Sequence, residues 1–156
     1  PGVWVLVDKT ARPNYKKGEQ LHKNDPLADL LKRLRGERKI EVPSELKHVP
    51  QTSRFAVSPN ELRQVVLPEI AKLLGIEVSQ VRLPKEIEFN VIGNFKHPEW
   101  GTVNTAEWLD DNFEDDGRLF GGHSGRGGLS LVSCRWSGYR HDRIAFRPLV
   151  VVSPKA

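Results

Sequence analysis

The sequence predicts one α+β domain, and three observations carry this prediction. Apolar residues recur at helical spacing in the N-terminal half, and apolar runs rich in β-branched residues lie near both ends of the 156-residue chain. Seven of the 13 glycines fall within residues 117–138, which predicts turns and short strands there. A chain of this length ordinarily forms a single domain, so we treat residues 1–156 as one domain.

The first elements follow from simple local signals. Residues 3–7 form a continuous apolar run, which predicts a strand covered on both faces. Residues 9–24 are polar and rich in lysine, and we expect a loop. Asp25 and Pro26 are typical of a helix start, and leucines at helical spacing predict a helix over 26–35 that stops at Gly36. Residues 37–53 show little periodicity and predict a long connection.

The clearest helix begins at Ser58. Ser58 and Glu61 match a capping box, and Pro59 takes the first helical position, where its missing N–H costs nothing. Gly75 marks the end of this helix, and Pro68 inside it predicts a kink or two short helices. The expected buried stripe consists of Leu62, Val65, Val66, Ile70, Leu73 and Leu74.

The segment 82–92 is ambiguous from its residues alone. Ile87, Phe89 and Val91 alternate as in a strand, whereas Leu83, Ile87 and Val91 also share one helix face, and Pro84 suits a helix start. Near the end of the chain, residues 144–152 are apolar and β-rich, and they predict a strand that stops before Pro154.

Charge and composition divide the chain at about residue 116. The formal net charge of +4 splits into −2 for residues 1–116 and +6 for residues 117–156, where arginine supplies nearly all of the positive charge. Lys, Glu and Gln make up 26 of the first 116 residues, but residues 117–154 contain none of them and no Met. An ordinary protein surface does not avoid these residue types together. This gap needs a cause.

Several classes of protein are disfavoured. Without a run of eighteen apolar residues we expect no membrane insertion, and the first residues lack the pattern of a signal peptide. The single Cys134 excludes an internal disulfide and a multi-cysteine metal site. We expect no metal and no cofactor.

Four motifs have both a functional and an ordinary interpretation. Residues 121–128 are glycine-rich like a phosphate loop, but no Lys-Ser/Thr pair follows, so tight turns are favoured. Cys134 with His123 or His141 could form a nucleophile and base, yet no third orienting group is evident. The acidic residues 110–116 lack EF-hand spacing and predict a solvated acidic turn. The remaining motif is a candidate nucleic-acid surface of Arg126, Arg135, Tyr139, Arg140, His141 and Arg143.

A series of short motifs occurs in a familiar order. The segments are RLPKEIEFNVIGN (82–94), HPEWG (97–101), TAEWLDDNFE (105–114), GRLFGGHSGRGGLS (117–130), WS (136–137) and IAFRPLVV (144–151). This order, over residues 54–154, resembles the variable proteins of diversity-generating retroelements. Those proteins have a C-type lectin fold related to that of formylglycine-generating enzymes.

The resemblance implies a C-type lectin-like fold with two main helices and a glycine-rich C-terminal β/loop region. The N- and C-terminal strands would pair, joining residues 3–7 to 146–152, and residues 84–92 would be helical. The helix over 26–35 and the lysine-rich loop before it would be a family insertion with a docking role. The side chains expected to form the core are Trp100, Trp108, Trp136 and Phe146.

The resemblance also offers a cause for the compositional gap. In this family a reverse transcriptase copies a template RNA and mutates its adenines, so that asparagine codons become NNC or NNT codons. Such codons cannot encode Lys, Glu, Gln, Met or Trp. The diversified positions implied here are His123, Arg126, Ser133, Cys134, Arg135, Gly138, Tyr139, Arg140, His141 and Arg143, with Ser130, Val132 and Ala145 as further candidates. The implied fixed scaffold comprises Gly121, Gly122, Gly127, Gly128, Trp136, Phe146 and Arg147.

These implications predict a non-catalytic ligand-binding protein. Residues 1–116 would be scaffold, and residues 117–154 would form a variable surface for a protein or cell-surface ligand, with no nucleic acid as partner and a virion or cell surface as a compatible location. Two alternatives stay open. One is a nucleic-acid-binding module that uses the arginine cluster, and the other is an enzyme of the formylglycine-generating type. Those enzymes need a cysteine pair, whereas this chain has only Cys134, and the Glu-Pro-Asn and Gln-Pro-Asp motifs of calcium-dependent lectins are absent.

Overall fold

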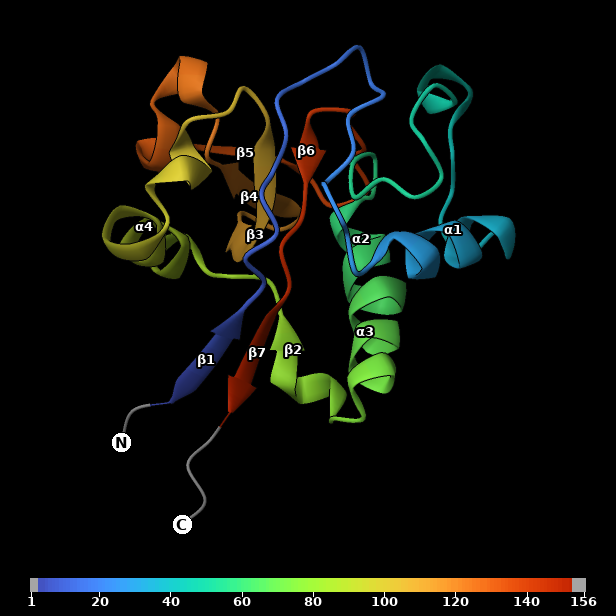
Figure 1. The fold of residues 1–156 in the computed structure, drawn as a ribbon, viewed down its shortest axis with the longest axis horizontal. Helices are drawn as coiled ribbons and strands as arrows, with labels where there is room; N and C mark the ends of the chain where they lie inside the picture. Colours follow the sequence, from blue (N-terminus) through green and yellow to red (C-terminus); the bar gives the residue numbers. More distant parts are fainter. Residues whose placement is uncertain (1–2, 153–156) are drawn as a thin grey trace.

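The computed structural model describes residues 3–152 and has a mixed α+β fold with two antiparallel-rich sheets (Figure 1). The smaller sheet has the strand order β1-β7-β2, and the larger sheet has the order β5-β4-β3-β6. The predicted stop at Pro154, and the last two residues of the predicted variable region, lie outside the described residues. The strands are β1 (Trp4–Val7), β2 (Val81–Arg82), β3 (Ala106–Phe113), β4 (Gly117–Gly121), β5 (Val132–Trp136), β6 (Ile144–Ala145) and β7 (Leu149–Val152). The helices are α1 (Ala28–Gly36), α2 (Pro59–Glu61), α3 (Leu67–Leu74) and α4 (Glu86–Lys96).

The smaller sheet joins the two ends of the described chain. Its central strand β7 pairs antiparallel with β1, in a register that places Trp4 opposite Val152 and Val7 opposite Leu149. The predicted pairing of the terminal strands is therefore confirmed. The prediction that β1 is covered on both faces is wrong, because Trp4 is 73% exposed and Leu6 is 64% exposed. β1 is an edge strand, and only the face that carries Val5 and Val7 packs inward.

The helix that begins at Ser58 has the predicted start and a specific irregularity at its proline. The Ser58 hydroxyl accepts from the Glu61 N–H while the Glu61 carboxylate accepts from the Ser58 N–H, so the capping box is confirmed. A π-helical turn spans Leu62–Val66 between α2 and α3. This turn lies directly before Pro68, which lacks the N–H needed for a regular helical bond and clashes with the preceding turn.

The π turn changes which face of this helix is buried. One extra residue in a turn rotates the following residues about the axis, so Leu67 and Ala71 join Leu62, Val66 and Ile70 in the core. Leu73 and Leu74, at the free end beside Gly75, are exposed, and their predicted burial is wrong. A prediction from regular helical spacing does not take such an insertion into account.

The other two helices have different outcomes. α4 settles the ambiguous segment as a helix, which buries Phe89 and Gly93 against the larger sheet and the segment after it. α1 begins at Ala28, two residues later than predicted, and the Asp25 carboxylate accepts from the Leu27 N–H at 2.9 Å. With α1, the continuous α2–α3 segment and α4, the described chain has three helical segments instead of the two main helices predicted.

The main core lies between the helices and the larger sheet. It contains Leu31 and Leu34 of α1, Leu62 and Val66, and the side chains of Trp108 and Phe146. Trp100 and Trp108 are each 1% exposed and Phe146 is fully buried, as predicted. Trp136 is 58% exposed, and its predicted place in the core is wrong because it ends the edge strand β5. The predicted acidic turn is limited to Glu114–Asp116, since Asp110 and Asp111 belong to β3.

A buried charge cluster ties three distant segments together. The Glu107 carboxylate of β3 lies 3.3 Å from an Arg12 guanidinium nitrogen and 2.8 Å from one of Arg147. Burial acts to raise the pKa of Glu107, but the two guanidinium groups outweigh it and lower that pKa to about 2. Arg147 also lies over the Trp100 ring, at 4.3 Å from its centroid. The loop before α1, the centre of the larger sheet and the segment leading into β7 are thus fixed to one another.

Candidate functional site

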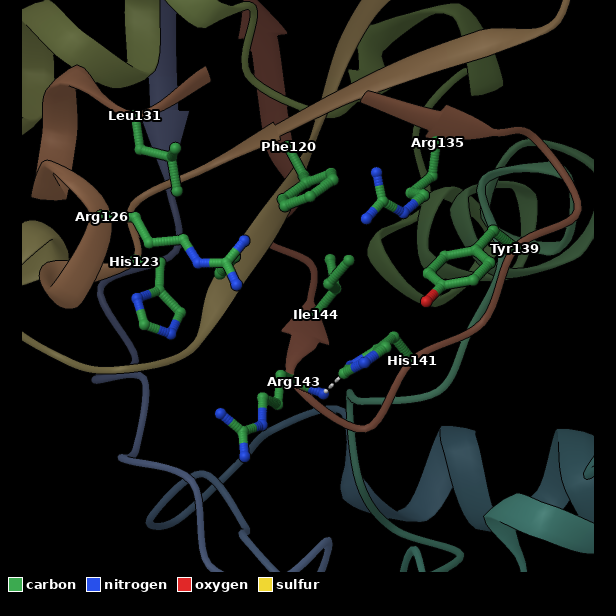
Figure 2. A pocket seen from close by; sticks show the side chains of 10 residues that line it. Phe120, His123, Arg126, Leu131, Arg135, Tyr139, His141, Arg143 and Ile144 are labelled. Carbon is green, nitrogen blue, oxygen red and sulfur yellow. Dashed lines mark hydrogen bonds between the residues drawn. The ribbon is translucent and has the colours of Figure 1, made fainter. Parts of the chain in front are cut away.

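The candidate site is a pocket of about 350 Å³ that opens on the larger sheet (Figure 2). Its floor comes from β3, β4 and β6, and its walls come from the loop after β4, from β5 and from the loop between β5 and β6. The lining residues are Ala106, Phe120, His123, Arg126, Leu131, Arg135, Tyr139, His141, Arg143 and Ile144.

Six of the ten positions predicted to bind a ligand line this pocket. They are His123, Arg126, Arg135, Tyr139, His141 and Arg143. None of the ten predicted positions is buried, and Arg126, Arg135 and Arg143 are exposed. Segments up to twenty residues apart in the sequence therefore present their side chains to one hollow of the surface.

The backbone holds the walls of the pocket. Two backbone hydrogen bonds hold the loop between β5 and β6. The Ala56 N–H donates to the His141 carbonyl at 3.1 Å, and the Ala106 N–H donates to the Arg143 carbonyl at 2.8 Å. On the opposite wall, the Arg126 N–H donates to the His123 carbonyl at 3.0 Å, inside the short helical turn η5 (Ser124–Arg126). Such bonds do not depend on which side chain a residue carries, so the wall geometry does not require these particular side chains.

Both histidines have a defined tautomer. The Gly125 N–H donates to His123 Nδ1 at 3.1 Å, and the Arg143 N–H donates to His141 Nδ1 at 3.0 Å. A backbone amide can only donate, so Nδ1 of each neutral ring is the acceptor and Nε2 carries the proton. Each ring therefore brings an N–H donor, and no free acceptor, to the pocket wall.

The electrostatic environment of the histidines is positive. Burial and the charges of Arg126 and Arg143 lower the pKa of His123. Burial, Arg143 and Arg135 lower the pKa of His141, against the opposing effect of the Asp142 carboxylate. Both rings are accordingly neutral at neutral pH, and the arginines set the sign of the local potential.

The arginines of the pocket differ from the other arginines near them. Within residues 3–152, Arg126, Arg135 and Arg143 form no ion pair with a carboxylate, while Arg140 pairs with Glu41 and Glu61. Arg135 instead lies between two rings, at 5.9 Å from the Phe120 centroid and 5.7 Å from that of Tyr139.

Arg143 lies 3.9 Å from the centroid of the Tyr15 ring. Tyr15 comes from the loop before α1, a segment that no local sequence pattern places at this site. The nearby Asp142 carboxylate is already engaged, because it accepts from the Tyr15 hydroxyl at 3.1 Å and lies 3.1 Å from His48 Nε2.

The other four predicted positions lie outside the pocket lining. Ser133 and Cys134 are half-buried in β5, opposite Phe120 and Leu119 of β4. The structure thus does not bring the Cys134 thiol into the pocket lined by the two histidines. Arg140 turns toward the scaffold, where its guanidinium donates to both oxygens of the Glu61 carboxylate at 3.0 Å.

The remaining predicted position is Gly138, and the further candidates are Ser130, Val132 and Ala145. A side chain at Gly138 would meet the ring of Trp136, which is exposed and has room to move. Ser130 and Val132 are exposed, as a surface role requires, but Ala145 is fully buried in β6. The structure contradicts a surface role for Ala145.

Sequence reasoning missed the floor of the pocket. Phe120 occupies the inward-facing position of β4 beside Trp108, and the two rings meet edge to face at 5.6 Å. The alternation of Leu119 and Phe120 in a strand was a usable signal, because only one of two neighbours can face each side of a sheet. Tyr15 and Ile144 reach the site through tertiary contacts that no local pattern predicts.

The glycine-rich segment does not form a phosphate loop. Gly127 and Gly128 have positive φ of 117° and 60°, and they link two short helical turns, η5 and η6 (Gly128–Ser130), instead of leading into an α-helix. A Cβ on Gly128 would lie 2.9 Å from the Gly101 carbonyl oxygen, so both conformation and space favour glycine.

Over residues 3–152, no group of three or more His, Cys, Asp or Glu side chains is arranged to hold a metal ion. None of the helices in that range has the length and apolar character needed to cross a membrane.

Comparisons with protein-family models, with curated proteins and with solved structures found no match for this chain. The arrangement itself is that of a basic, partly aromatic pocket whose walls come from loops on a separately packed core. Such an arrangement can bind a ligand without contributing a nucleophile to it.

Proposed function

We propose that this protein is a non-catalytic ligand-binding protein whose C-terminal surface is diversified by a retroelement, on a C-type lectin-like fold. One observation carries the proposal. In a segment without Lys, Glu, Gln or Met, six of the ten predicted ligand-binding positions line one pocket, and none of the ten is buried.

The separation between the packed core and the walls of the pocket supports this proposal. A surface that must accept many side chains cannot use them to hold the fold together. The walls of the pocket are fixed by backbone hydrogen bonds, and the core rests on residues such as Trp100, Trp108 and Phe146. The paired strands β1 and β7 are a further feature that agrees with a lectin-like fold.

The partner is proposed to be a protein or another molecule on a cell surface. Arginine, tyrosine and histidine offer large contact areas and directional donors, and arginine and tyrosine are enriched where interfaces gain most of their binding energy. The pocket holds three arginines, two histidines and one tyrosine.

The DNA that surrounds the gene provides the decisive experiment. A near-copy of the coding sequence for residues 117–150 is expected beside a reverse transcriptase gene, with mismatches confined to positions where the copy has adenine. Mismatches spread over all four bases, or the absence of such a copy, would refute diversification. The codon for Trp136, TGG, lies inside the expected copy and contains no adenine, so it should be identical in the two sequences and serves as an internal control.

The unpaired arginines favour nucleic-acid binding as a second candidate function. Binding of this kind falls steeply with salt, because each neutralised phosphate releases counterions. A single-stranded oligonucleotide whose affinity falls with salt and is lost in the triple Arg126→Gln, Arg135→Gln, Arg143→Gln variant would support it. Binding that is absent at low salt would exclude it.

A further inference from the structure

The chemical groups that line the pocket are strongly biased toward hydrogen-bond donors. Three guanidinium groups and two imidazole Nε2–H groups donate and have no free acceptor, and no carboxylate belongs to the lining. Only the Tyr139 hydroxyl can both donate and accept. A ligand that satisfies such a pocket must supply acceptor oxygens, and an oxyanion supplies the most for its size.

The positive charge of the three pocket arginines is opposed by one nearby carboxylate, that of Asp142, which lies 3.3 Å from His141 Nδ1. Arg126, Arg135 and Arg143 lack an ion pair within residues 3–152, and the Asp142 carboxylate contacts Tyr15, His48 and His141 instead of these arginines. Burial is the largest cause of the lowered pKa values of His123 and His141. Arg126, Arg143 and Arg12 lower the pKa of the first ring further, and Arg143 and Arg135 lower that of the second, where Asp142 acts against them. An incoming anion would therefore meet an attractive potential.

The floor of the pocket is aromatic and apolar. Phe120 and Tyr139 bracket the guanidinium of Arg135, and Leu131, Ile144 and Ala106 complete the apolar surface. Figure 2 shows Phe120 between the side chains of Arg126 and Arg135, which extend toward it from two different walls. A flat ring that enters here would lie on apolar side chains while its substituent meets the arginines.

The size of the pocket limits the ligand group. A volume of about 350 Å³ lies at the lower end of the range of about 300–1,000 Å³ for small-molecule sites. It suits one substituted ring and is too small for a folded segment of a partner. The occupant is thus a single side chain or a molecule of that size.

We propose that in this variant the pocket binds an oxyanion carried on an aromatic ring, as in a phosphorylated or sulfated tyrosine side chain of a protein ligand. This inference rests on the proposed function only in taking the pocket as the ligand site. Arg126 and Arg135 bind the anionic oxygens, the Nε2–H groups of His123 and His141 donate to them, and Phe120 and Tyr139 contact the ring.

Titration of the full chain with matched small molecules tests the proposal. Phenyl phosphate carries both features, inorganic phosphate lacks the ring, and benzyl alcohol lacks the anion. NMR of the histidine ring protons at pH 7.5 and constant ionic strength reports binding at the pocket itself. Phenyl phosphate is expected to shift the His123 and His141 signals and to bind about tenfold or more tightly than inorganic phosphate.

Two variants distinguish binding at the pocket from a general effect of net charge. Arg126→Gln with Arg135→Gln is expected to weaken phenyl phosphate binding about tenfold or more. Arg38→Gln, an exposed site at the end of α1, removes charge without touching the pocket and is expected to leave binding unchanged. Circular dichroism shows whether each variant is folded. If the double variant does not fold, the titration of the unmodified chain with the three small molecules still tests the proposal.

Two outcomes would overturn the proposal. One is equal binding of inorganic phosphate and phenyl phosphate, which would mean general anion binding without recognition of a ring. The other is the absence of any phenyl phosphate effect on the His123 and His141 signals. Neither outcome bears on the template copy in the DNA, so failure of this inference and failure of the proposed function are distinguishable.

A peptide pair identifies the source of the group. A short peptide with phosphotyrosine is compared with the same peptide carrying tyrosine and with phenyl phosphate. Tighter binding of the phosphorylated peptide than of phenyl phosphate supports a protein ligand. Equal binding of the two supports recognition of the aryl oxyanion and overturns the assignment to a protein.

Discussion

A fall in pH from 7.5 to 5 is expected to destabilise this protein, because the folded chain keeps His22 neutral while the unfolded chain protonates it. His22 lies in the loop before α1, is 6% exposed and packs against the Phe55 ring at 5.6 Å between centroids. Neither ring nitrogen has a hydrogen-bond partner within the described structure. Burial, with the charge of Arg54 and a smaller effect of Arg147, lowers the pKa of His22 from 6.5 to about 4, although Glu107 and Asp25 oppose this shift.

The sign and size of the effect follow from these two pKa values. The unfolded chain takes up a proton near pH 6.5, whereas the folded chain resists it until about pH 4. The stability that the neutral ring provides is thus complete above pH 6.5 and is lost as the pH falls from 6.5 to 4. Between pH 7.5 and pH 5 the loss from His22 amounts to about 2 kcal/mol of unfolding free energy.

Urea denaturation monitored by tryptophan fluorescence measures this loss, because Trp100 and Trp108 are buried in the fold. A His22→Leu variant removes the titrating ring and its two unpaired buried nitrogens. Between pH 7.5 and pH 5, the decrease in its unfolding free energy should be about 2 kcal/mol smaller than that of the unmodified chain. A His97→Leu control retains His22 and should keep its contribution to the pH dependence. An unchanged pH dependence in His22→Leu would refute the argument.

Three further changes have defined outcomes. Glu107→Gln leaves two buried guanidinium groups without their carboxylate and should cost about 3–5 kcal/mol, measured by urea denaturation. Gly128→Ala places a methyl group against the Gly101 carbonyl at a residue with positive φ, and it should lower the unfolding free energy by about 1–3 kcal/mol. In the matched variant Gly125→Ala the methyl group meets only the movable His123 ring, and the loss should be less than about 1 kcal/mol. Thermal unfolding of the two variants measures the difference. Arg126→Ser should change the unfolding free energy by less than about 0.5 kcal/mol, because that side chain has no hydrogen-bond or ion-pair partner among residues 3–152. Arg140→Ser should lose about 1–2 kcal/mol by removing the bonds to Glu61.

Local signals predicted the parts of the fold that local chemistry decides. The capping box of Ser58 and Glu61 involves residues three apart, and its two bonds form as the residue types indicate. The disturbance at Pro68 likewise follows from its missing N–H. The exposure of Leu73 and Leu74 was not predictable in this way, since it depends on where the π turn is inserted.

Residues of the candidate site fall into two groups for a related reason. The positions at 123–143 could be named because their composition and their resemblance to a known family mark them without any knowledge of contacts. Tyr15, by contrast, lies 128 residues before Arg143 in the chain, and only tertiary packing brings its ring to 3.9 Å from that guanidinium. Arg140 was grouped with the pocket residues by type, but Glu41 and Glu61 draw it to the scaffold.

The position of β7 has a consequence for the order in which the chain can fold. β7 is the central strand of its sheet, so β1 and β2 have no partner until residues 149–152 have been synthesised. A contact with such a large sequence separation forms slowly, and the apolar edge carrying Trp4 and Leu6 stays unpaired meanwhile. Residues 117–145 lie within the loop that this pairing closes. A substitution in that segment that prevented the chain from turning back would therefore leave β1 unpaired, with its apolar edge exposed.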